Sequence, residues 1–110
     1  MDTRKKILEE LVSLSRDIKD IKSDLNQFSW DSEEELYTIS KNDIMSMLSR
    51  YLSSEIDNIQ LEDWANIIEG REDIGYENED IEEIILELSN PVLYGDMSFE
   101  HANMILSKLT

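Results

Sequence analysis

Acidic side chains are the residues of this sequence that could do chemistry. The stretch Leu61–Glu87, LEDWANIIEGREDIGYENEDIEEIILE, holds eleven Asp and Glu residues and a single base, Arg71. Carboxylates at this density can bind a basic protein, hold a divalent ion or act in pairs as general acid and base. Because clustered like charges repel one another and destabilise a compact chain, the stretch suggests a ligand outside the fold.

The motifs for metal and enzyme chemistry are incomplete. The chain has no Cys and one His, so thiolate sites are excluded. Ser98 stands three residues before His101, where a bundle-type di-metal site needs Glu. A Ca²⁺ loop starting at Asp73 would have Gly75 in the wrong place, and the sequence has no nucleophile elbow or phosphate-binding glycine loop. We therefore expect no enzymatic activity, no metal site and no cofactor.

The net negative charge is confined to the chain after residue 27. Six bases and six acids balance in the first 27 residues, whereas the whole chain carries a formal charge of −16 at pH 7. Such a surface repels nucleic-acid phosphates and attracts a basic protein domain. We hypothesise an acidic contact face with Tyr76 as the first aromatic anchor and Trp30 as the second. Its carboxylates would be Glu69, Glu72, Asp73, Glu77, Glu79, Asp80, Glu82 and Glu83.

Composition predicts one domain over residues 1–110. The length is typical of a single domain, and 40% hydrophobic residues suffice for a core. One Pro and three Gly argue against disorder and against a turn-rich β chain. No continuous apolar run indicates a signal peptide or a membrane span, so we expect a cytoplasmic protein.

Residues 1–27 predict one long helix from about Thr3 to Gln27. Its apolar residues recur at heptad spacing, with Thr3 as a candidate N-cap. Two interpretations of this stripe are open: packing on the other helices, or a homodimer through Ile7–Leu25. The stripe consists of Ile7, Leu11, Leu14, Ile18, Ile21 and Leu25.

Residues 40–110 predict an acidic bundle of four more helices. The first is capped by Ser40 with Asp43 and ends near Ser53, and the second runs from about Leu61 to a C′ glycine, Gly70. Trp64 lies in the apolar stripe of this second helix and is expected in the core. The others run from about Glu79 to Ser89, before Pro91, and from Ser98 to about Leu109.

The segments between these helices are expected to be irregular. Phe28–Ile39 is predicted as a loop or short helix, Ile56–Gln60 as a connector and Val92–Met97 as a loop turning at Gly95. Arg71–Asn78 is predicted as a turn, with Ile74 and Tyr76 facing inward or covering the helix ends and Glu72, Asp73 and Glu77 facing water. The expected fold class is all-α, a bundle of about five helices without a sheet.

From about Lys41 to the C-terminus, the sequence resembles small acidic helical immunity proteins of bacterial polymorphic toxin and contact-dependent growth inhibition systems. The resemblance is carried by KNDIMSMLSRYL, LEDWANIIEGREDIGYE and ILELSNPVLYGDMSFEHANMIL. Its most distinctive residues are Trp64, Ala65, Glu69, Arg71, Asp73 and Ile74. It covers about two thirds of the chain and excludes the N-terminal helix. It implies a protein that neutralises a toxin by binding it, without a catalytic motif.

The acidic face fits this role, because toxins that cleave RNA or DNA hold phosphates in basic clefts that an anionic protein can occupy. Two alternative functions are also compatible with this sequence. One is a nucleic-acid mimic that inhibits a DNA- or RNA-binding regulator. The other is a non-enzymatic adaptor that dimerises through the N-terminal helix, with the acids serving solubility.

Overall fold

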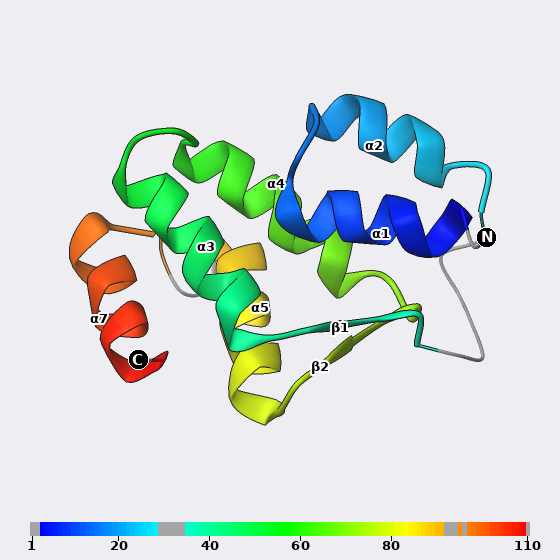
Figure 1. The fold of residues 1–110 in the computed structure, drawn as a ribbon. Helices are drawn as coiled ribbons and strands as arrows, with labels where there is room; N and C mark the ends of the chain where they lie inside the picture. The colour runs from blue at the N-terminus through cyan, green and yellow to red at the C-terminus, as the bar shows by residue number, and fades with distance from the viewer. Residues whose placement is uncertain (1–2, 29–34, 92–94, 96, 110) are drawn as a thin grey trace.

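The computed structural model describes residues 3–28, 35–91, 95 and 97–109. In this part of the chain, six helices pack together with a small parallel sheet of two strands, which lies along one side of them (Figure 1). The predominantly helical prediction is confirmed, but the five-helix count and the absence of a sheet are wrong. The elements are α1 Thr3–Ser13, α2 Ile18–Leu25, β1 Tyr37–Ile39, α3 Lys41–Leu52, α4 Asn58–Glu69, β2 Ile74–Tyr76, α5 Glu79–Ser89 and α7 Phe99–Leu109.

The predicted long N-terminal helix is two helices, α1 and α2, which lie side by side in Figure 1. The break begins at Leu14, whose φ of 48° is left-handed and ends α1. Asp17 then caps α2, because its side chain accepts a hydrogen bond from the Lys19 N–H at 2.9 Å. Arg16 lies between the helices and pairs with Glu10 on α1 and with Asp24 on α2.

The heptad stripe faces the interior of the same chain. Ile18 is partly buried, and the other stripe residues, Ile7, Leu11, Leu14, Ile21 and Leu25, are buried. Trp64 on α4 is fully buried, as predicted, and its Nε1–H donates to the Leu11 carbonyl at 2.9 Å and to that of Val12 at 3.2 Å. These carbonyls belong to the C-terminal end of α1, where that of Leu11 also accepts from the Leu14 N–H at 3.1 Å. The N-terminal helices are therefore packed into the core.

The sheet pairs two segments that were expected to be irregular. β1 and β2 are parallel, with Tyr37 opposite Ile74 and Ile39 opposite Tyr76. The connection between them passes through α3 and α4, as a parallel pair requires. Each strand has three residues, which is too short for an alternating pattern to stand out in the sequence.

The helix starts follow local capping chemistry. Ser40 and Asp43 form the predicted capping box of α3. α4 begins three residues earlier than predicted, because Asp57 and Gln60 form a second capping box within the supposed connector. Gly70 follows the last residue of α4, as predicted, but it is the C-cap residue with a right-handed φ of −81° and not a C′ glycine.

The last two helices begin and end close to the predicted residues. Asn78 caps α5, and the Ser98 hydroxyl accepts from the His101 N–H at 3.0 Å at the start of α7. Gly95 has a φ of 86°, in keeping with its predicted turning role, while most of Val92–Met97 lies outside the described residues. None of the helices in the described ranges is both long and apolar enough to cross a membrane.

Candidate functional site

Helix α5 carries the densest group of exposed carboxylates. Its apolar side, Ile81, Ile85 and Leu88, is buried, and the helix packs mainly on α4. Its exposed sides present Glu79, Asp80, Glu82 and Glu83, which fall in the first turns of the helix. Carboxylates there interact favourably with the helix dipole, which offsets part of their mutual repulsion.

Tyr76 lies beside this group, at the end of β2. Its ring is half-buried, and burial, followed by the negative charges of Glu82 and Glu69, raises the pKa of the Tyr76 hydroxyl to about 12. The structure thus brings together three of the predicted contact residues from α4, β2 and α5. The phenol keeps its proton at neutral pH and can donate a hydrogen bond while it lies near negatively charged carboxylates.

Two other predicted residues are exposed but differ in their surroundings. Glu77 accepts a hydrogen bond from the Lys41 N–H at 2.8 Å, so it also supports the N-terminus of α3. Glu72 is exposed to solvent. Trp30, the second predicted anchor, lies outside the described residues.

Asp73 does not belong to the contact face, and the prediction that it faces water is wrong. The residue is completely buried. Its Oδ1 accepts from Arg71 Nε at 2.9 Å, and its Oδ2 accepts from Arg71 Nη2 at 2.8 Å and from Arg4 Nε at 2.9 Å. A buried carboxylate is tolerated here because two guanidinium groups compensate its charge. Asp73 therefore joins the N-terminus of α1 to the segment before β2.

The buried pairing of Asp73 leaves the acidic face without an ion-paired base. Arg71, the single base of the acidic stretch, is engaged by Asp73 and has only 8% of its side chain exposed. In the described ranges, no Lys or Arg lies within ion-pair distance of six of the predicted contact residues. We call these six carboxylates the acidic surface: Glu69, Glu72, Glu79, Asp80, Glu82 and Glu83.

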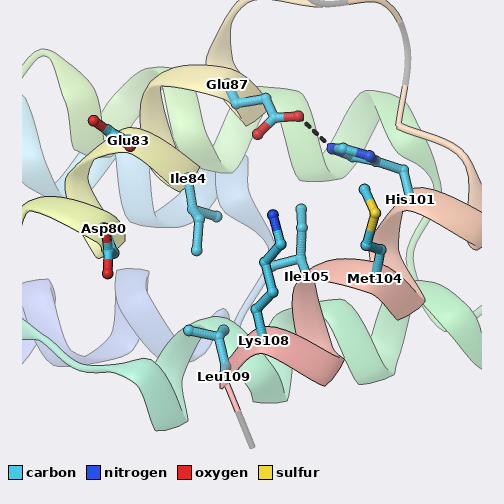
Figure 2. A pocket seen from close by; sticks show the side chains of 9 residues that line it. All are labelled: Asp80, Glu83, Ile84, Glu87, His101, Met104, Ile105, Lys108 and Leu109. Atoms are coloured by element: carbon cyan, nitrogen blue, oxygen red, sulfur yellow. Dashed lines mark hydrogen bonds and ion pairs between the residues drawn. The ribbon is translucent and has the colours of Figure 1, made fainter.

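A groove between α5 and α7 was not predicted. Each helix packs on a different partner, α5 on α4 and α7 on α3, and a hollow of about 270 Å³ remains between them (Figure 2). His101 Nε2 and Glu87 Oε1 form an ion pair or hydrogen bond across one end. The groove is lined by Asp80, Glu83, Ile84, Glu87, His101, Met104, Ile105, Lys108 and Leu109.

The sequence held a signal for this groove. Asp80, Glu83, Ile84 and Glu87 follow the i, i+3, i+4, i+7 spacing of one helix face, and so do His101, Met104, Ile105 and Lys108. Neither face is purely apolar, so neither predicts a surface that packs against another helix. What the spacing alone could not reveal is that the two faces oppose each other.

The part of the chain that the structure describes has no cluster of three or more His, Asp or Glu side chains able to hold a metal ion. Every buried side-chain nitrogen and oxygen there has a hydrogen-bond partner.

No protein-family model, curated protein or solved structure matches the chain. Its function is therefore inferred from its own charges, exposure and geometry.

Proposed function

We propose that this protein is an immunity protein that binds a basic bacterial toxin domain, in the first instance a nuclease, and covers its substrate cleft. The observation that carries the proposal is the acidic surface, whose six exposed carboxylates have no Lys or Arg within ion-pair distance in the described residues; two of them, Glu69 and Glu82, act on Tyr76. Uncompensated charge of one sign is costly within a fold and useful against a partner of the opposite sign.

The geometry supports binding by a charged rim with a central anchor. The negative charges of Glu69 and Glu82 act on Tyr76, which offers a half-buried aromatic ring and a protonated hydroxyl. Aromatic residues surrounded by polar groups are the usual source of affinity in protein interfaces, whereas the charges mainly set the association rate and the orientation. Binding should therefore be fast at low salt and weaken steeply as salt is added.

The nuclease class follows from the chemistry of the cleft that would accept such a surface. A nuclease holds phosphates with Lys and Arg, and carboxylates can pair with the same side chains. The toxin context comes from the sequence resemblance described above. A mimic that inhibits a DNA- or RNA-binding regulator would use the same acidic surface, and only the identity of the partner separates the two.

The adaptor alternative has less support. A homodimer through Ile7–Leu25 needs an exposed stripe, but its residues are buried or partly buried against other helices of the same chain. Dimerisation by this route would require α1 and α2 to leave the core. It would also break the hydrogen bonds between Trp64 and the end of α1.

The proposal is tested by capturing the partner from the native host with tagged protein at low salt and eluting it with high salt. The captured protein is then assayed for nuclease activity while this protein is titrated into the reaction. The proposal predicts a basic domain whose activity is lost near a 1:1 ratio. Recovery of a DNA- or RNA-binding regulator would favour the mimic, and recovery of the protein alone would favour the adaptor.

A matched pair of variants locates the contact. Glu69→Gln with Glu82→Gln removes two charges beside Tyr76, whereas Glu9→Gln with Asp20→Asn removes two exposed charges from α1 and α2. We expect the first pair to weaken inhibition about tenfold at low salt and the second to change it less than about twofold. Equal effects of the two pairs would contradict the proposed contact.

A further inference from the structure

We propose that the groove between α5 and α7 is the binding site for a basic amphipathic helical segment of the partner. An aliphatic side chain of the segment would rest on the apolar floor, and its Lys or Arg residues would pair with Asp80 and Glu83. The proposal rests on the proposed function for the existence of a basic partner. The chemistry of the occupant follows from the residues that line the groove.

The floor of the groove is apolar and partly open. Ile84 projects from α5, while Met104 and Ile105 project from α7 toward the same space (Figure 2). Met104 is 48% exposed, which leaves a flexible thioether at the surface of the groove. Methionine adapts its shape to different aliphatic partners, so this floor suits an inserted Leu, Ile or Met.

The α5 wall of the groove selects for positive charge. On α5, Asp80 and Glu83 are exposed and have no basic partner within ion-pair distance in the described ranges, while Glu87 is engaged by His101. On α7, Lys108 extends into the space between the two helices (Figure 2). The chain thus places a cation of its own in the groove, where it competes with a Lys or Arg of the occupant for the carboxylates of α5.

The length of the groove fits a short helix. Asp80 and Glu87 lie about 10 Å apart along the axis of α5, because each residue advances the helix by about 1.5 Å. This corresponds to about two turns of a bound helix. An occupant with bases at i, i+3 and i+7 and an aliphatic residue at i+4 would match the spacing of the α5 wall, with its third base competing with His101 for Glu87.

The groove and the Tyr76 contact lie on opposite flanks of α5. Asp80 and Glu82 are two residues apart, and side chains with this spacing point to different sides of a helix. Glu82 acts on Tyr76, whereas Asp80 lines the groove. Two contacts separated by one helix can therefore be altered independently.

The probe is a blocked peptide of about 16 residues, long enough to form a helix in part, that carries Lys at i, i+3 and i+7 and Leu at i+4. A scrambled peptide of the same composition and charge is its control. Fluorescence anisotropy of the labelled peptides at about 20 mM salt gives the affinities, and amide chemical-shift changes locate the site. We expect the patterned peptide to bind about tenfold more tightly than the scrambled one and to shift amides of α5 and α7.

Charge-matched protein variants complete the test. Asp80→Asn with Glu83→Gln should weaken binding of the patterned peptide about tenfold, whereas Glu69→Gln with Glu82→Gln should change it less than about twofold. Lys108→Ala should strengthen binding, because it removes a competing cation, and it leaves the core intact since Lys108 is exposed. Equal binding of the two peptides, or equal losses from the two variants, would overturn the groove assignment.

The two proposals fail differently. A basic partner whose binding responds to Glu69→Gln with Glu82→Gln but not to the groove variant would leave the function standing and refute the groove. A groove that binds the patterned peptide, in a protein that inhibits no basic partner, would refute the function and keep the groove.

Discussion

Replacing Asp73 by Ala should destabilise the fold more than any other single change to an acidic residue of the described chain. Asp73 is fully buried and accepts three hydrogen bonds from two guanidinium groups. Its loss leaves Arg71, 8% exposed, and Arg4, 19% exposed, without their shared counter-charge. Breaking a buried ion pair from one side costs about 3–5 kcal/mol.

This cost is large against the total stability of a domain, which is about 5–15 kcal/mol. For a chain of this length, each kcal/mol corresponds to about 4 °C, so Tm should fall by about 12–20 °C. Urea unfolding followed by circular dichroism measures the free energy, and calorimetry measures Tm. The matched control is Glu72→Ala, which removes a neighbouring exposed carboxylate and should change stability by less than about 0.5 kcal/mol.

The order of the arginine variants provides a second check. Arg71 donates two hydrogen bonds to Asp73, whereas a single one is described from the more exposed Arg4. Arg71→Ala should therefore cost more than Arg4→Ala. A loss below about 1 kcal/mol for Asp73→Ala, or a loss equal to that of Glu72→Ala, would refute the buried-triad explanation.

Three further predictions follow from the packing and from the tyrosines. Trp64→Phe should lower the free energy of unfolding by about 1–3 kcal/mol in urea titrations, because two carbonyls at the end of α1 lose a buried donor; an unchanged midpoint would contradict this. Deleting residues 1–27 should abolish cooperative unfolding in calorimetry, and a folded remainder would show that α1 and α2 are dispensable. Stability should fall as pH rises from 10 to about 12, because unfolded Tyr37 and Tyr76 lose protons that the folded chain retains. In an absorbance titration, the Tyr76→Phe variant should lack one of the phenols that lose their protons late in the wild type. If the variant and the wild type show the same tyrosine absorbance change between pH 10 and about 12, the assignment is refuted.

The helices from α3 onward were predictable because their ends carry local chemistry. Ser40, Asn78 and Ser98 are side-chain acceptors that satisfy the first N–H groups of α3, α5 and α7. The break between α1 and α2 was missed because the heptad spacing continues through it. Asp17, directly before the apolar Ile18, was the available cap signal.

The sheet and the buried carboxylate depend on contacts between distant segments. β1 and β2 are separated by two helices, and each is too short to show a periodic pattern. Asp73 reads as one acid among eleven, and nothing in its neighbourhood indicates that Arg4, 69 residues away, approaches it. Of the predicted contact residues, Tyr76 lies near the exposed carboxylates Glu69 and Glu82, whereas Asp73 lies in the interior.

The central claim is that the acidic surface binds a basic partner. It is tested most directly by measuring the salt dependence of binding to the captured partner for the wild type and for a variant with Glu69, Asp80, Glu82 and Glu83 changed to their amides. Because the variant removes four of six carboxylates, we predict affinity lower by at least about a hundredfold at low salt and a much shallower salt dependence. Equal affinities and equal salt slopes for the two proteins would contradict the claim.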